Sequence, residues 1–181
     1  MAASTGGLEA IQRVLQRLPG RFPPIVIAQH LDPTLGEQFS GLLRDALRLE
    51  VVAVDTTATL QGNRIYVAAR AQHIYVRPGC VATRPAQPGE LAPSADQLFF
   101  SVAGLCGNAA LGIVLTGMGH DGARGLRALR DAGSWTIAQD QSSALVSGMP
   151  AAAIELGACR EILGLDEIAA RLSHILPRGP R

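Results

Sequence analysis

Three polar residues of the types that perform acyl transfer lie at the ends of predicted strands. Ser4 precedes the first amphipathic run, His30 ends the apolar run 25–28, and Asp121 follows the apolar run 111–115. Because ligands of an open α/β sheet bind where the strands end and loops lead into helices, we expect these side chains to meet there. A serine hydroxyl is a weak nucleophile until an imidazole takes its proton, and a carboxylate holds that imidazole in the required tautomer. The three residue types therefore predict a Ser-His-Asp triad.

Each of these residues also has a structural interpretation. A serine before an amphipathic run is a common helix N-cap, so Ser4 could cap the helix expected over 8–18. The stretch Ser-Thr-Gly-Gly at 4–7 could also cradle a phosphate at that helix N-terminus. His30 could be satisfied by backbone groups at a strand end, and Asp121 could cap the helix that follows it.

Three further histidines are alternatives for the base. His120 lies in the same loop as Asp121 and competes with His30 on position. His73 lies in a predicted hairpin and His174 near a helix end, and both compete less well. Position alone leaves the choice of base open.

Apolar runs and helical periodicity alternate along the chain, which is typical of an α/β protein. The expected fold is a doubly wound α/β domain with a mostly parallel sheet, helices on both faces and a β-hairpin insert. We expect residues 1–176 to form a single domain and 177–181 to form a flexible tail. Strands are expected at 25–28, 51–54, 111–115 and 135–138, hairpin pieces at 64–68 and 73–76, and helices at 8–18, 34–43, 94–105, 126–129, from 150, and at 166–176.

The composition argues against several other functions. A net charge of +1 and an aromatic content of 4% give no electrostatic or stacking surface for nucleic acid. No apolar run reaches the roughly 20 residues of a membrane helix, and the N-terminus lacks a signal-peptide pattern. The three cysteines are widely spaced, and no Cys/His cluster has zinc-ligand spacing. We therefore expect a cytoplasmic protein that needs no metal or cofactor.

Longer motifs around the candidate residues carry a family resemblance. In chain order they are Ala-Ser-Thr-Gly-Gly at 3–7, Ala-Gln-His at 28–30, Leu-Thr-Gly-Met-Gly-His-Asp-Gly-Ala at 115–123, Ala-Gln-Asp at 138–140 and Gly-Met-Pro at 148–150. In this set and order they resemble the catalytic domain of the chemotaxis protein-glutamate methylesterases, the CheB family, from Ala3 to about Leu172. The order Ser, His, Asp along the chain differs from that of the α/β-hydrolases.

The resemblance implies a role for each candidate residue. It implies Ser4 as the nucleophile, His30 as the base and Asp121 as the orienting carboxylate, with the backbone N–H groups of Met118 and Thr5 as oxyanion donors. It implies hydrolysis of glutamyl methyl esters, deamidation of glutamine side chains, and no cofactor. The implied partner is the cytoplasmic helical bundle of a methylated chemoreceptor or a similar methylated protein. The alternatives are a serine esterase or amidase for another acyl substrate and a non-catalytic phosphate-binding module.

The chain departs from the family pattern at four places. It leaves no room for the receiver domain that usually precedes the catalytic domain, so we expect none. Ala2 stands where glycine is usual, which requires a negative φ at that position. Ala-Arg-Ala-Gln at 69–72 replaces Pro-Gly before His73, and Leu-Ala at 91–92 precedes Pro93 where a basic residue is common. We expect the last two changes to lie near the substrate rim and to affect recognition rather than chemistry.

Overall fold

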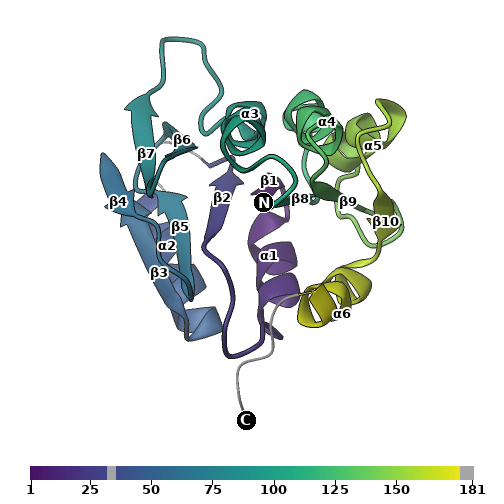
Figure 1. Cartoon of the computed structure of the whole chain (residues 1–181), viewed down its shortest axis with the longest axis horizontal. Coiled ribbons are helices and arrows are strands. Elements are labelled where there is room, and N and C mark those ends of the chain that lie inside the picture. Colours follow the sequence, from purple (N-terminus) through teal and green to yellow (C-terminus); the bar gives the residue numbers. More distant parts are fainter. Residues whose placement is uncertain (32–35, 176–181) are drawn as a thin grey trace.

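A seven-stranded parallel sheet forms the centre of the molecule. A computed structural model describes residues 1–31 and 36–175 of the 181-residue chain. Within that part, every pairing between neighbouring strands of this sheet is parallel. The strand order is β10 (Glu161–Leu163), β9 (Trp135–Gln139), β8 (Leu111–Val114), β1 (Ala2–Ala3), β2 (Ile25–Gln29), β5 (Arg64–Ala68) and β3 (Glu50–Val54) (Figure 1).

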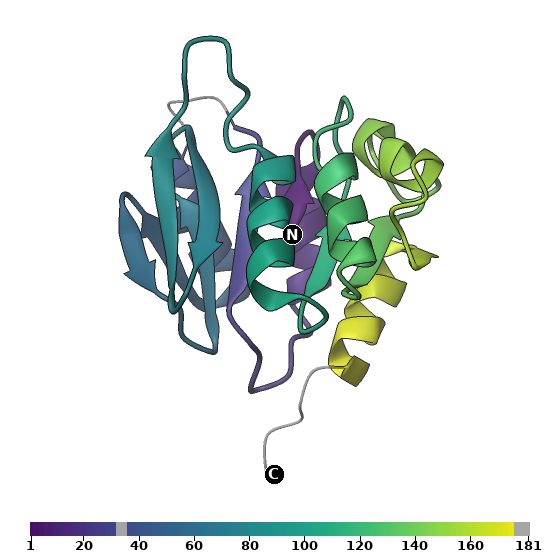
Figure 2. The same cartoon turned by 45° about the horizontal axis from the view of Figure 1, so that its top comes forward.

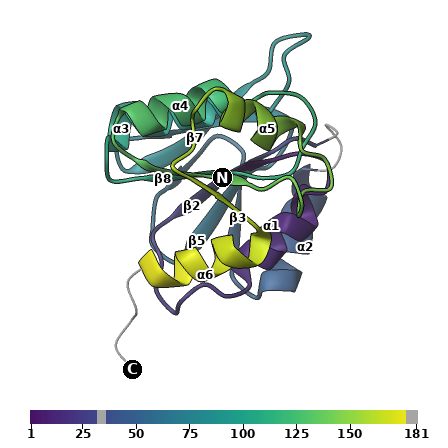
Figure 3. The same cartoon turned by 90° about the vertical axis from the view of Figure 1, so that its right-hand side faces the viewer.

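Helices cover both faces of the sheet. One face carries α1 (Gly7–Leu15), α2 (Gly36–Leu47) and α6 (Leu165–Ile175), and the other carries α3 (Ala95–Cys106), α4 (Ala123–Asp131) and α5 (Gly148–Glu155) (Figure 3). Each helix layer packs its apolar stripe on the sheet, which gives two separate clusters of buried apolar side chains. Because both faces are covered, the central strands are continuous apolar runs rather than alternating ones. The doubly wound fold expected from the sequence is confirmed.

A three-stranded antiparallel sheet flanks the side of the main sheet where β5 and β3 lie. It consists of β4 (Thr57–Thr59), β7 (Cys80–Pro85) and β6 (Gln72–Arg77). The β6–β7 hairpin confirms the expected insert, and Gly79 adopts the positive φ of 73° that its turn requires. A long loop leads from β7 to α3, and α3 lies beside α4 over the sheet (Figure 2).

Two predictions about strands were incomplete or wrong. The segment 64–68 was expected in a hairpin, but it is β5, which pairs in parallel with both β2 and β3. Its residues Ile65 and Tyr66 are fully buried, as in an inner strand of a covered sheet. The three-residue edge strand β10 was not predicted, because so short a run has no readable periodicity.

The short strand β1 lies where the two halves of the sheet meet: β2, β5 and β3 follow on one side, and β8, β9 and β10 on the other. It pairs with β2 on one side and with β8 on the other, so the order of connections reverses between β1 and β8. Ligands of doubly wound sheets bind outside the carboxyl ends of the strands at such a switch point. Ser4 follows β1 directly and therefore lies at this edge.

Some of the expectations fall on residues that the structure does not describe. The capping box expected at 34–37 begins in the segment 32–35, and the tail expected at 177–181 falls in the terminal segment 176–181. Both lie outside the described residues.

Candidate active site

The turn between β1 and α1 leaves the Ser4 hydroxyl without a structural role. Gly6 is the N-cap of α1, with a φ of 77° and no side-chain cap, so Ser4 is not the helix cap. The Ser4 carbonyl accepts the Gly7 N–H at 2.8 Å and the Gln29 Nε2 at 2.8 Å, and its N–H donates to the Thr116 carbonyl at 2.9 Å. The backbone of Ser4 is therefore fixed on three sides. Within the described residues, its half-buried hydroxyl makes no hydrogen bond.

Two glycines allow the chain to pack closely around Ser4. A Cβ added at Gly7 would lie 2.0 Å from the Oε1 of Gln29, and one added at Gly117 would lie 2.7 Å from the Cβ of Ser4. Neither position has room for a side chain. Ala2 meets no such conflict, because it lies in β1 and the only described non-glycine residues with positive φ are Arg48 and Asn63. Alanine in place of the family's glycine is therefore compatible with the turn.

His30 and Asp121 form a hydrogen-bonded pair beside this turn. The Nε2 atom of His30 lies 2.8 Å from the Oδ2 atom of Asp121, and the two side chains are 7% and 16% exposed. An ionised carboxylate only accepts hydrogen bonds, so Nε2 carries the proton and Nδ1 has the free lone pair.

The register of the sheet sets Ser4 opposite His30. Ala3 pairs with Gln29 in the parallel ladder, and the His30 N–H donates to the Ala3 carbonyl at 3.0 Å. Adjacent strands are about 4.8 Å apart, so the two residues that follow this pair start from neighbouring backbone positions. The structure describes both side chains and records no hydrogen bond between them. Catalytic contacts are often loose before substrate binds.

Asp121 is held by the first turn of α3. Its carboxylate accepts the Ser94 hydroxyl at 3.0 Å, the Ala95 N–H at 2.6 Å and the Asp96 N–H at 3.0 Å. Burial raises the pKa of Asp121, but the hydrogen bonds from His30 and from the Asp96 and Ala95 N–H groups outweigh it, so the pKa lies below its ordinary value. The carboxylate is therefore ionised and fixed in direction at neutral pH.

Asp121 does not cap its own helix, as one interpretation of the sequence had it. The N-cap of α4 is Gly122, at a φ of 94° and without a side-chain cap. The N-terminus of α4 is served by the other helix: Asp96 accepts the Gly125 N–H at 2.7 Å and the Arg124 Nε at 3.1 Å. The loop before α4 thus places a carboxylate on the N-terminus of α3, and α3 places one on the N-terminus of α4, where the helix dipole favours negative charge. We call this arrangement the reciprocal cap.

Two backbone N–H groups at the candidate oxyanion positions are free. Among the described residues, the N–H groups of Thr5 and Met118 make no hydrogen bond. The Thr116 hydroxyl fixes the surrounding loops, because it donates to the Thr5 carbonyl at 2.9 Å and accepts the Val146 N–H at 2.9 Å. The Thr116 N–H donates to the buried Oε1 of Gln139 at 2.7 Å. The two free N–H groups therefore lie on loops that a shared threonine ties together.

The other histidines occupy different surroundings. His73 is 1% exposed and bonds to Glu90 and to the Ser94 N–H, rather than to Ser4. His120 is exposed, and its side chain makes no hydrogen bond with any described residue. His174 is exposed near the end of α6. Of the four, only His30 pairs with Asp121.

An open cleft runs from Ser4 along one side of α1. Ser4, Thr5, Gln29 and His30 line it together with polar and apolar residues of α1 and α2, which include Leu8, Glu9, Gln12, Gln38, Phe39 and Leu42. Two large apolar side chains stand exposed on the loops that adjoin Ser4: Met118 is 70% exposed and Leu145 is 74% exposed. The cleft is polar at Ser4 and of mixed polarity along the helices, and the two exposed side chains give the edge an apolar surround.

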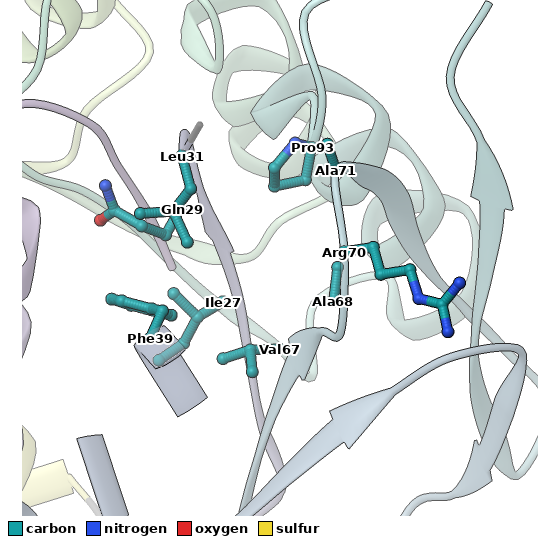
Figure 4. A pocket seen from close by; sticks show the side chains of 9 residues that line it. All are labelled: Ile27, Gln29, Leu31, Phe39, Val67, Ala68, Arg70, Ala71 and Pro93. Carbon is teal, nitrogen blue, oxygen red and sulfur yellow. The ribbon is translucent and has the colours of Figure 1, made fainter. Parts of the chain in front are cut away.

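A small pocket beside this edge is lined by Arg70 and Ala71, from one segment that departs from the family pattern, and by Pro93, which follows the other. In Figure 4, Ala71 and Pro93 stand together and face Gln29 and Leu31, which flank His30 in the chain. The Arg70 side chain points away from the pocket, and its Nε lies 3.5 Å from the Oδ1 of Asp55. Arg70 therefore does not supply the basic group that is missing before Pro93.

Over the described ranges, no group of three or more His, Cys, Asp or Glu residues is arranged to hold a metal ion. In the same part of the chain, no helix is long and apolar enough to span a membrane.

Fold and site together define the class of the protein as a doubly wound α/β domain with a serine, a histidine and an aspartate at its switch point. The model of one family, CheB methylesterase, matches residues 1–172. The chain belongs to the CheB methylesterase family.

Individual relatives agree with this assignment. The chain is 39% identical over 177 residues to a protein-glutamate methylesterase/protein-glutamine glutaminase of Saccharophagus degradans, covering 95% of this chain and 51% of that protein. It is 42% identical over 178 residues to one of Rhodospirillum rubrum, covering 95% of this chain and 49% of that protein. The chain thus spans about half the length of these curated relatives.

A solved structure shares the fold. The catalytic domain of the CheB methylesterase of Thermotoga maritima superposes with a TM-score of 0.88 at 26% identity, covering 97% of this chain and 96% of that one.

Proposed function

We propose that this chain is a serine hydrolase that removes methyl groups from glutamyl methyl esters of a protein, with Ser4 as the nucleophile. His30 accepts the Ser4 proton at Nδ1 as Oγ attacks the ester carbonyl carbon. Asp121 holds the opposite ring nitrogen and stabilises the imidazolium that forms. His30 then protonates the departing methanol, and a water molecule, deprotonated by the same ring, releases the glutamate from Ser4.

One observation carries this proposal above the others. A buried histidine, 2.8 Å from a carboxylate that backbone N–H groups keep ionised, stands opposite a serine whose hydroxyl no other described residue uses. A phosphate-binding loop needs neither the imidazole nor the carboxylate. The family of the chain, whose relatives are named protein-glutamate methylesterases, supports the same reaction.

The developing negative charge would be met by backbone donors. The free N–H groups of Thr5 and Met118 are the proposed oxyanion hole. Thr5 follows Ser4 in the chain, Met118 follows Gly117, which packs against Ser4, and neither N–H has a hydrogen-bond partner among the described residues. Removing a single donor of this kind costs roughly 3–4 kcal/mol in serine hydrolases, which shows the size of their contribution. Deamidation of glutamine side chains would use the same groups, with ammonia as the leaving group in place of methanol.

The proposed partner is a methylated helical protein of the cytoplasm, such as the signalling bundle of a chemoreceptor. The exposed Met118 and Leu145 and the open cleft beside Ser4 offer an apolar surround for such a segment. We further propose that residues 1–176 act as one catalytic domain.

The test is methanol release from a receptor fragment that carries glutamyl methyl esters. We expect Ser4→Ala to abolish release while the circular dichroism spectrum and the unfolding midpoint stay unchanged, because the hydroxyl supports no contact in the fold. Ser142→Ala, at an exposed loop serine, is the matched control and should keep full release. Release by Ser4→Ala at the wild-type rate would rule out Ser4 as the nucleophile.

A further inference from the structure

A second histidine–carboxylate pair lies behind the first. His73, at the start of β6, is 1% exposed, and both of its ring nitrogens have partners. The Ser94 N–H donates to Nδ1 at 3.2 Å, and Nε2 lies 2.9 Å from the Oε2 of Glu90. Because Nδ1 accepts a hydrogen bond, Nε2 carries the proton and donates a hydrogen bond to Glu90.

Glu90 is well prepared to hold this ring. Its Oε2 also accepts the Gln87 N–H at 2.8 Å and the Arg84 Nη1 at 3.2 Å. The hydrogen bonds from Gln87, Arg84 and His73 lower the pKa of Glu90 to about 2, so the carboxylate is ionised at every pH at which the protein would work. Arg84 also donates to the Oε1 of Gln97 at 3.0 Å, which ties the same hairpin to α3.

Ser94 joins this pair to the candidate active site. Its N–H binds His73, while its hydroxyl donates to the Oδ1 of Asp121 at 3.0 Å and accepts the Gln97 N–H as the N-cap of α3. The Ala95 and Asp96 N–H groups that hold Asp121 follow directly in the chain. The orientation of Ser94 therefore determines how its hydroxyl and the two N–H groups that follow it are directed at the Asp121 carboxylate.

We propose that His73 and Glu90 are a positioning pair for the active site, and that they act through Ser94 to hold Asp121 against His30. The chemical role of His30 in this statement rests on the proposed function; the coupling between the two histidines does not. The functional atom is Nδ1 of His73, which is the buried acceptor of the Ser94 N–H. Glu90 contributes by fixing the tautomer that leaves Nδ1 free to accept.

The alternative is that His73 merely fills space between β6 and α3. A space-filling role depends on the volume of the ring, whereas a positioning role depends on an acceptor at one particular atom. Asparagine and glutamine distinguish the space-filling role from the positioning role. The Oδ1 of asparagine occupies the place of Nδ1 and keeps the acceptor, whereas the amide nitrogen of glutamine occupies the place of Nε2 and leaves no acceptor at Nδ1. The pair His73→Asn and His73→Gln is therefore the matched comparison, with His73→Ala as the full deletion.

The measurement is the proton NMR signal of His30 Nε2–H in the whole chain. A buried imidazole proton shared with a carboxylate gives a strongly deshielded, slowly exchanging resonance, which His30→Gln identifies by its disappearance. We expect this signal to persist in His73→Asn and to be lost in His73→Gln and His73→Ala. Ile74→Val, at a fully buried neighbour on β6, is the packing control and should retain it.

Two outcomes would overturn the proposal. A His30 signal that is unchanged in both His73→Gln and His73→Ala would show that Asp121 does not depend on His73. Loss of the signal in His73→Asn as well as in His73→Gln would assign the effect to ring packing. Because the readout needs no substrate, failure of the methylesterase assay would leave this result interpretable.

Activity gives a second readout with the same pattern. If the proposed reaction is correct, His73→Gln lowers kcat for the methyl ester and leaves KM unchanged, while His73→Asn restores kcat. A fall in kcat that is equal in both variants would contradict a positioning role for the Nδ1 atom.

Discussion

At the residue scale, Asp121 has the most constrained environment in the site. Its two oxygens accept from a hydroxyl, two backbone N–H groups and an imidazole. An asparagine there loses the charge and presents an NH₂ group either to donors of α3 or to His30, which favours the wrong tautomer. We expect Asp121→Asn to lower kcat on the order of 10⁴-fold, as in other serine triads.

The control for this variant is Asp131→Asn, at an exposed aspartate of α4 that pairs with Arg127. It should leave methanol release near the wild-type rate. Release by Asp121→Asn within about tenfold of wild type would mean that the carboxylate does not orient the base.

The same variant tests the electrostatics of the fold. The pKa of Asp121 is lowered in the folded protein, so its charge adds stability above the ordinary aspartate value of about 3.9, and that contribution is lost as the pH falls through the lowered value. In urea unfolding, the gap in free energy between wild type and Asp121→Asn should therefore narrow as the pH is taken from 5 to 3. If the difference in free energy of unfolding widened over this range, the pKa of Asp121 would be raised in the folded protein and not lowered.

The sequence alone was enough to name three candidate residues of the site. Ser4, His30 and Asp121 were candidates because each follows a predicted strand, and the family motifs around them implied their roles. In the structure all three lie at one sheet edge. Ser94 and Asp96 were read only as a helix start. Their bonds to Asp121 and Gly125 depend on how α3 lies against α4, which no local spacing encodes.

At the element scale, the reciprocal cap depends on a close approach of α3 and α4. Gly125 makes this possible, because a Cβ added there would lie 2.6 Å from the Asp96 carbonyl oxygen and 2.7 Å from the Cβ of Phe99. Gly125→Ala must push the helices apart, and with them the N–H groups that hold Asp121. We expect a loss of about 1–3 kcal/mol in the free energy of unfolding together with lower activity.

Gly104 offers the matched control, because it lies within α3 and an added Cβ there would meet nothing within 4 Å. Gly104→Ala should raise the free energy of unfolding by about 0.5–1 kcal/mol through helix propensity and leave activity unchanged. Equal effects of the two alanines in urea unfolding would show that the contact between the helices is not tight at Gly125.

Other elements show where sequence patterns stop being informative. The runs at 25–28 and 111–115 are long, apolar and bounded by turn residues, so their strands were predicted nearly to the residue. The segment 64–68 has the same apolar character, but the turn residues around it suggested a hairpin. Only pairing with the distant β2 and β3 makes it an inner parallel strand.

At the scale of the whole molecule, the residues that stabilise the fold and the candidate catalytic residues occupy different places. Two apolar cores, one under each helix layer, hold the sheet, while the candidate residues lie at its carboxyl edge outside both cores. The short β1 lies between β2 and β8, so Ser4 stands between the strand that His30 follows and the loop that holds Asp121. The sequence predicted this edge because ligands of an open α/β sheet bind where its strands end and loops lead into helices.

The most direct test of Ser4 as the nucleophile is covalent labelling with a fluorophosphonate while methanol release is measured. Activated serines of hydrolases react with such reagents, whereas ordinary hydroxyls do not. We expect one label per chain, located on Ser4 by mass spectrometry of the peptide, with methanol release falling in proportion to labelling. Full labelling of Ser4 without loss of methanol release, or loss of release through a label on another residue, would contradict it.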